Sequence, residues 1–274
     1  KTGNSLITRG CNIASNSNKT IAAILKRALA TSGLPSNSIQ AVSPDLGTTI
    51  QELVTQDRYL NLIIPYGRPS LVQQVAEKAT ATVLKTTIGN CYLYWSISGS
   101  LELTRQVIID SHNSQPDAVN AIEKVLVNRD IKPSVLRSLL SSLQQQGFAL
   151  RGDVVLVDEF PEYLKLIQPE EWHRPYLDRI VTFRFVDSLA QAVFWINRYS
   201  SGHADCIVTE SYQESRPFVQ GIDSALVYIN TSPKFSRNPE GGENVFLGMS
   251  NQKGYRQGLI SVETFTTIKQ VVQG

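Results

Sequence analysis

Hydrophobic and polar residues follow two periods along the chain. Short runs of apolar and β-branched residues predict strands, and segments with an apolar residue at every third or fourth position predict amphipathic helices. In the first part of the chain, strands are expected at residues 5–8, 39–42, 60–64, 82–84 and 92–95, and helices at 18–30, 48–55, 69–79 and 101–111. Asn18 is an expected N-cap, and Pro69 suits a first helical turn, which needs no N–H from it.

The second part of the chain continues this alternation. Helices are expected at 134–146 and 189–199, and strands at 149–157, 206–209 and 226–229. The tail has strand character at 260–262 and helical character after Glu263. Strands that alternate with helices of this length favour right-handed crossovers and a mostly parallel sheet. The pattern therefore predicts an α/β fold.

The composition is that of a globular protein with a core. The chain has 274 residues, of which 42% are hydrophobic and 18% charged, and its net charge is +2. It has no basic block that would indicate nucleic-acid binding, and no apolar run reaches the ~18 residues of a membrane span. Cys11, Cys91 and Cys206 form neither a disulfide framework nor a metal-ligand pattern. We therefore expect a reduced, cytoplasmic protein without a secretory signal or a metal site.

One stretch carries a recognisable motif. Between Ser114 and Val127 the sequence reads Asn120-Ala121-x-Glu123-x-x-Leu126-Val127. This pattern resembles the nucleophile segment of γ-glutamyl phosphate reductase, a member of the aldehyde dehydrogenase superfamily. In that family the segment reads roughly Arg-Pro-x-x-Cys-Asn-Ala-x-Glu-x-Leu-Leu-Val. Gln115 stands here at the arginine position and Val119 at the cysteine position.

The resemblance extends over nearly the whole chain. Further counterparts occur, in order, at 17–18, 63–67, 89–94, 199–210, 230–235, 248–250 and 269–274. They imply an aldehyde dehydrogenase-like fold with a Rossmann-related cofactor-binding half at 1–113, a catalytic-type half at 114–257, and a tail at 258–274 that serves oligomerisation. The opening run from Lys1 to Gly10 matches residues well inside the family's chain, so we expect an N-terminal portion to be missing.

The family's chemistry requires a thiolate. The thiolate attacks an acyl phosphate, or an aldehyde in reverse, and the adduct then exchanges hydride with the nicotinamide of NADP(H). Val119 has no lone pair. Cys91 matches a cysteine that accompanies the family's site, and it could become the nucleophile only after a backbone shift. Asn120 matches a residue whose side-chain amide helps to form the oxyanion hole in the family; a turn or helix-cap role is the alternative.

Other polar positions of the family's site have changed as well. Arginine, histidine, arginine, glutamate, arginine and histidine in the family correspond to Gln115, Tyr92, Lys234, Phe246, Gln257 and Tyr255. The apolar frame around these positions persists. This combination predicts that selection on the chemistry has been lost while the fold has been kept.

The implied cofactor site lies in two stretches. Arg9 matches the position that contacts the adenosine side of the cofactor in the family; a surface charge is the alternative. The family's Pro-Arg-Gly-Gly turn reads Pro65-Tyr66-Gly67-Arg68 here. Two glycines in this turn would let the backbone come close to the phosphates of the cofactor. Arg68 stands at the second glycine position, and its long side chain could either block the path of the phosphates or pair with one of them. Binding of NADP(H) is left open on these grounds.

The remaining candidates favour structural roles. His203 is expected in a turn or cap, and His112 and His173 in solvent. Cys206 is expected as a small buried hydrophobe, and Glu162, Glu170 and Glu171 as a solvated acidic surface.

Three hypotheses follow from the sequence. The preferred one is an inactive family member with a structural or regulatory role, a pseudoenzyme within proline biosynthesis. The second is an active NADPH-dependent reductase with an altered site, and the third a nucleotide-binding module without turnover. The apolar residues of the tail predict association into a homo- or hetero-oligomer, because exposed apolar edges are normally covered.

Overall fold

In the computed structural model, residues 2–43, 47, 49–86, 88–113, 119–237, 245–254 and 256–274 are described. The chain divides by its packing into two compact units, each described on its own. The first unit holds Lys1–Tyr66, Ser70–Lys85 and Ser261–Gly274, and the second holds Gly67–Pro69 and Thr86–Ile260. The expected boundary at Ser114 lies outside the described residues, and the assignment of a cofactor-binding and a catalytic-type half stays a prediction.

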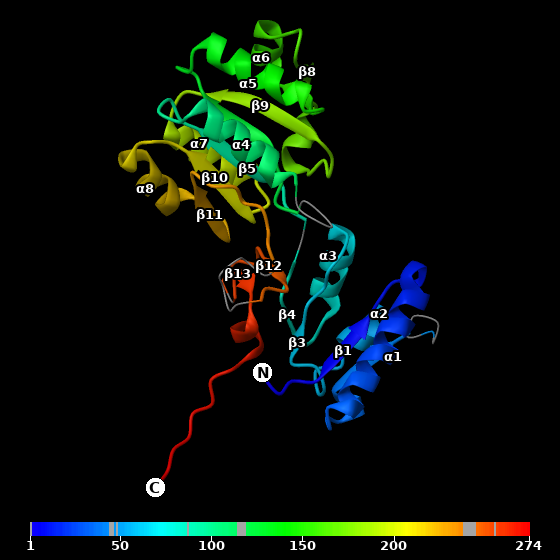
Figure 1. Ribbon diagram of the computed structural model, residues 1–274. Coiled ribbons are helices and arrows are strands. Elements are labelled where there is room, and N and C mark those ends of the chain that lie inside the picture. The colour runs from blue at the N-terminus through cyan, green and yellow to red at the C-terminus, as the bar shows by residue number, and fades with distance from the viewer. Residues whose placement is uncertain are drawn as a thin grey trace. The chain divides into compact units, whose positions relative to one another are not determined.

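The first unit consists of short parallel strand pairs and helices. Strand β1 (Leu6–Arg9) pairs with β2 (Ile39–Val42), and β3 (Leu62–Ile63) pairs with β4 (Thr82–Val83). Its helices are α1 (Ser15–Thr31), α2 (Ile50–Val54) and most of α3 (Pro69–Lys78), with the 3-10 helices η1 (Asn12–Ala14), η2 (Ser36–Ser38) and η5 (Val262–Phe265) (Figure 1). A capping box between Thr49 and Glu52 begins α2.

The second unit is built on a seven-stranded sheet. Its order is β11-β10-β5-β6-β9-β7-β8, and every neighbouring pair is parallel. The strands are β5 (Cys91–Trp95), β6 (Ile122–Asn128), β7 (Ala149–Gly152), β8 (Lys165–Leu166), β9 (Ile180–Val186), β10 (Ala204–Val208) and β11 (Leu226–Ile229). A separate antiparallel pair joins β12 (Gly248–Ser250) to β13 (Gly258–Ile260).

Helices cover both faces of this sheet. They are α4 (Leu101–Ser111), α5 (Pro133–Gln145), α6 (Val154–Glu159), α7 (Leu189–Tyr199) and α8 (Tyr212–Gly221), with the 3-10 helix η4 (Pro169–His173). Leu93 and Trp95 of β5 pack in one apolar cluster with α4 and α5, whereas Tyr92 and Tyr94 pack in the other with α7 and α8. Both faces of the central strands are therefore buried, which explains their continuous apolar runs.

The structure confirms the predicted α/β class and its parallel sheet, and it corrects three details. Helix α1 begins at Ser15, so Asn18 lies inside it and is not the N-cap; the preceding η1 runs directly into the helix. The expected strand at 149–157 ends at Gly152, and Asp153 then caps α6 through the Leu156 N–H. The tail pairs as β13 at 258–260, and 266–274 form no helix or strand. No helix among the described residues is long and apolar enough to cross a membrane.

Candidate functional site

The nucleophile segment lies against the start of strand β5. The Gly89 N–H donates to the Val119 carbonyl over 3.1 Å. A Cβ atom at Gly89 would lie 2.4 Å from that carbonyl oxygen and 2.9 Å from the Cys91 Sγ. Only glycine permits this close approach without a shift of the backbone. Val119 and Asn120, just before β6, therefore lie near Cys91 at the start of β5, and their role as a site stays a prediction.

Cys91 is a poor nucleophile in this position. Its side chain is fully buried in the core. Burial raises the pKa of the thiol well above its usual value, and the charge of Asp205 raises it further. A protonated thiol does not attack carbonyl carbon, because the thiolate is the reactive form. The Cys91 thiol therefore lies protonated inside the core, and the half-buried Val119 carries no nucleophilic atom.

Asn120 is buried and hydrogen-bonded within the protein. Its Nδ2 donates to the Pro233 carbonyl over 3.0 Å, and its side chain is 1% exposed. This contact fixes the amide orientation, since a flipped amide would place two oxygens face to face. Donation to a main-chain carbonyl agrees with a structural role. It leaves the oxyanion-hole role of Asn120 as a prediction.

A second asparagine, which the sequence reasoning did not single out, supports the same strand. Asn90 Nδ2 donates to the carbonyls of Trp172 (2.8 Å) and Tyr199 (2.9 Å). Its backbone N–H donates to Ser201 Oγ over 2.7 Å. The residue directly before β5 is thereby hydrogen-bonded to η4 and to the end of α7. The sequence signal for this residue is the Gly89-Asn90-Cys91 run, in which an asparagine stands directly before the buried strand.

Asp205 forms a buried carboxylate beside this site. It accepts from the Tyr92 N–H over 2.7 Å, from Ser200 Oγ over 2.7 Å, and from Ser224 Oγ. Burial raises the pKa of this carboxyl to about 6, and the three hydrogen bonds oppose that rise. His203 is buried nearby, with Nδ1 3.0 Å from Ser201 Oγ, in the expected turn.

The other expected site positions scatter. Lys234 forms an ion pair with Asp110 over 3.4 Å, and the half-buried Phe246 donates its N–H to the Arg237 carbonyl. Gln115 and Tyr255 lie outside the described residues.

The prediction that His112 is solvated is wrong. Its Nε2 lies 3.0 Å from the Ile122 carbonyl, and its ring packs edge-on against Phe148. His173 is exposed as expected, and Cys206 is buried as expected.

The candidate cofactor residues fall in different compact units, so each stretch is described separately. Arg9 is the last residue of β1, and Gly10 follows it; a Cβ at Gly10 would lie 1.9 Å from Asn18 Nδ2. The end of the Asn18 side chain therefore lies against the backbone that follows β1. In the other stretch, the exposed Arg68 directly precedes Pro69, the first residue of α3. A cation at a helix N-terminus adds to an environment that attracts anions.

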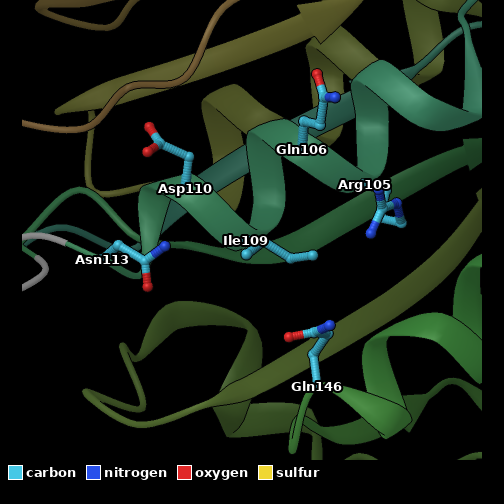
Figure 2. Close-up of a pocket in the computed structure, with 6 residues that line it drawn as sticks. All are labelled: Arg105, Gln106, Ile109, Asp110, Asn113 and Gln146. Carbon is cyan, nitrogen blue, oxygen red and sulfur yellow. The ribbon is translucent and has the colours of Figure 1, made fainter.

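A shallow cavity lies beside α4 (Figure 2). Its volume is about 320 Å³, and it is lined by Arg105, Gln106, Ile109, Asp110, Asn113 and Gln146. Two charged side chains of the lining form ion pairs within the protein: Arg105 pairs with Glu102, and Asp110 pairs with Lys234. None of the sequence-predicted site residues lines it. Within the described ranges, no three His, Cys, Asp or Glu side chains gather as metal ligands.

Sequence comparison identifies close relatives. Over its whole length the chain is 53% identical to γ-glutamyl phosphate reductase 2 of Synechocystis sp. and 37% identical to the γ-glutamyl phosphate reductase of Gloeobacter violaceus. It spans 65% of the length of each of these relatives. No protein-family model matches the chain.

Solved structures agree with this comparison. The γ-glutamyl phosphate reductase of Thermotoga maritima superposes with a TM-score of 0.90 at 32% identity, covering 99% of this chain and 66% of that one. A propionaldehyde dehydrogenase of Clostridium phytofermentans superposes with a TM-score of 0.72 at 15% identity, which shows the shared fold alone, over 97% of this chain and 68% of that one. On these matches, and with the motifs in their expected order, the chain is similar over its whole length to γ-glutamyl phosphate reductases and has the aldehyde dehydrogenase fold.

Proposed function

We propose that this family member does not reduce γ-glutamyl phosphate through a cysteine and acts as a structural or regulatory subunit in proline biosynthesis. The observation that carries the proposal is Val119 at the nucleophile position, held by the Gly89 contact where the motif expects a thiol. A valine cannot form the thioester on which the hydride transfer depends.

The surroundings of Val119 support the same conclusion. Cys91 is adjacent, but its thiol is fully buried and its pKa is raised by that burial. Reaching an acyl phosphate would require both exposure of this thiol and loss of its proton. Asn120, whose amide nitrogen would serve an oxyanion, instead donates to the Pro233 carbonyl.

Nucleotide binding without turnover is the second candidate. Arg68 is exposed directly before Pro69, the first residue of α3. It would offer positive charge to a phosphate of NADP(H), which when bound supplies the hydride in the family reaction. Arg9, the last residue of β1, is a separate candidate contact within the first unit. Titration of the full-length protein with NADPH tests this candidate. Binding that Arg68→Ala weakens supports a phosphate contact, and tighter binding by that variant indicates that Arg68 blocks the path.

A subunit role also needs a surface for association. Ile268, Val271 and Val272 in the tail are 93%, 80% and 96% exposed. Apolar side chains left this open in the chain's own fold are normally covered by a partner. The tail is therefore the proposed oligomerisation element, toward a second copy or a related subunit.

Turnover of the full-length protein tests the proposal. We expect no NADPH oxidation with freshly prepared γ-glutamyl phosphate, and no NADP⁺ reduction with glutamate semialdehyde and phosphate, above a control without enzyme. Cys91→Ala is the matched variant. Turnover by the unchanged protein that this variant abolishes would overturn the proposal and identify Cys91 as a relocated nucleophile.

A further inference from the structure

Strand β6 contains one residue more than its neighbour at the edge of the candidate site. Cys91 lies opposite Ile122, but the next residue, Tyr92, lies opposite Lys124. Glu123 is therefore the extra residue of a β-bulge. Bulges bend a strand locally and re-aim a side chain, and they are frequent next to functional sites. This one follows Val119–Asn120 by three positions.

The bulge turns the Glu123 carboxylate toward the loop after η4. Its two oxygens accept from the backbone N–H groups of Tyr176 (2.5 Å) and Leu177 (2.8 Å). Leu177 has a left-handed backbone with φ 57°, an unfavourable conformation for leucine. The carboxylate is 2% exposed, so these two amides replace water as its hydrogen-bond donors.

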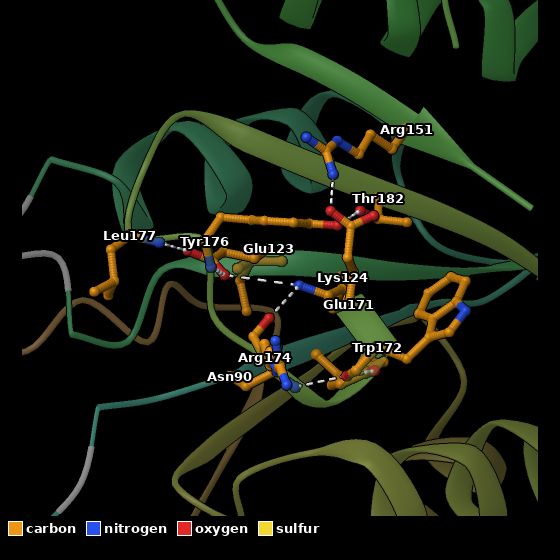
Figure 3. Close-up of polar contacts among 12 residues, drawn as sticks. Asn90, Glu123, Lys124, Arg151, Glu171, Trp172, Arg174, Tyr176, Leu177 and Thr182 are labelled. Carbon is orange, nitrogen blue, oxygen red and sulfur yellow. Dashed lines mark hydrogen bonds and ion pairs between the residues drawn. The ribbon is translucent and has the colours of Figure 1, made fainter. Parts of the chain in front are cut away.

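Lys124 supplies the charge that balances this carboxylate. Its Nζ lies 3.7 Å from Glu123 Oε2, 3.2 Å from the Arg174 carbonyl, and 3.8 Å from the centre of the Tyr176 ring. The side chain is fully buried. Figure 3 shows the ammonium between the strand and the loop, with contacts to both. Two of these contacts join the lysine to residues 174–177. The third joins it to the Glu123 carboxylate, which holds that segment.

The two charges depend on each other. Burial raises the pKa of Glu123, and the charge of Lys124 is the largest effect that lowers it again. Burial lowers the pKa of Lys124 to about 8, and Glu123 opposes that shift. The other ionisable groups that interact with the pair include Cys91 on β5, Arg151 on β7 and the hydroxyl of Tyr176 in the loop. Arg151 lies 5.0 Å from the Tyr176 ring and pairs with Glu171 of η4.

The loop held in this way also supports the candidate site. The Trp172 carbonyl accepts from Asn90 Nδ2 and from the Tyr92 hydroxyl, over 2.8 and 2.7 Å. Strand β5 at Cys91 and strand β6 after Asn120 therefore bind one continuous segment, residues 172–177. We propose that Lys124 is a positioning residue that keeps the Glu123 carboxylate ionised, so that this carboxylate holds the backbone of Tyr176 and Leu177 against the bulge beside Val119 and Asn120.

The proposal predicts a local, pH-dependent loss of order in Lys124→Met. Without the ammonium, Glu123 takes up a proton at higher pH and becomes a weaker acceptor. Amide hydrogen exchange of the full-length protein, followed by NMR and corrected for intrinsic rates, measures this. At pH 6 we expect the Tyr176 and Leu177 amides of Lys124→Met to exchange roughly tenfold to a hundredfold faster than in the unchanged protein. The effect should shrink as the pH rises.

Two controls separate positioning from general destabilisation. The amides of Val125 and Val127 in β6 should keep their protection in Lys124→Met. Glu123→Gln should weaken protection at Tyr176 and Leu177 to the same extent at every pH, because it has no carboxyl to titrate. Unchanged exchange at both amides in Lys124→Met overturns the proposal, and so does an equal, pH-independent loss across the β6 amides. Because the readout is exchange and not turnover, its outcome is independent of whether the protein is an active reductase.

Discussion

Asp205→Asn should remove a large pH dependence from the stability of the second compact unit. Asp205 is fully buried, and its pKa is raised from 3.8 to about 6, first because of burial. The folded state therefore binds a proton below about pH 6, whereas the unfolded chain does so only below about 3.8. Between these values the folded state holds more protons, so a rise in pH destabilises it.

The magnitude follows from the shift. One pKa unit corresponds to about 1.4 kcal/mol, so the free energy of unfolding should fall by about 3 kcal/mol as the pH rises from below 3.8 to above about 6. The stabilisation that comes from protonation of Asp205 is fully present below the pKa of this group in the unfolded chain. It is lost as the pH rises through the pKa of the group in the folded state. Asparagine keeps the oxygen that accepts from the Tyr92 N–H, and its amide faces the hydroxyls of Ser200 and Ser224, which can turn to accept.

Denaturant unfolding at a series of pH values measures this effect. Trp95, Trp172 and Trp195 all lie in the second unit, so tryptophan fluorescence reports on its unfolding. The difference in unfolding free energy between Asp205→Asn and the unchanged protein should rise by about 3 kcal/mol across this window, since all other titrations cancel. A flat or falling difference for Asp205→Asn would refute the reasoning.

Three further predictions concern the site and the tail. Val119→Cys should not restore useful reductase activity in the turnover assay, because site groups act as a unit and Phe246 and Gln257 are unchanged; efficient turnover would show that the rest of the site is intact. Gly89→Ala should destabilise the second unit by about 1–3 kcal/mol in denaturant unfolding, because its Cβ would lie 2.4 Å from the Val119 oxygen; an unchanged midpoint would contradict the close approach. Light scattering at micromolar concentration should give a mass above that of a single chain, alone or with a related subunit, and a strict monomer under both conditions would refute the subunit role.

Much of the fold could be predicted because it rests on local periodicity. Helix α4 and strand β2 coincide with the expected ranges, since their apolar spacing and flanking turns are intrinsic to the sequence. Strand β9 and helix α8 were missed. Pro217 inside α8 argues locally against a helix, yet the helix buries Phe218 under the sheet. Tertiary burial overrides propensity at such positions.

The candidate site residues came only from a motif. The motif pointed to Val119, Asn120 and Cys91, and in the structure Gly89 lies against the Val119 carbonyl and the Cys91 Sγ. The burial of Cys91 and the engagement of the Asn120 amide depend on strands and loops far away in sequence, so spacing could not reveal them. The Glu123–Lys124 pair left one signal, two charges inside an apolar run. Its partners at 174–177 lie about fifty residues further on, joined by 2.5 and 2.8 Å contacts.

The proposed absence of a working nucleophile is tested most directly by looking for the covalent intermediate. The full-length protein is incubated with γ-glutamyl phosphate without NADPH, quenched in acid, and weighed intact by mass spectrometry. Attack by a thiolate would release phosphate and leave a γ-glutamyl thioester, so the protein would gain the mass of one glutamyl group. The account predicts an unchanged mass. A stoichiometric glutamyl adduct on a cysteine, removed by Cys91→Ala, would contradict it.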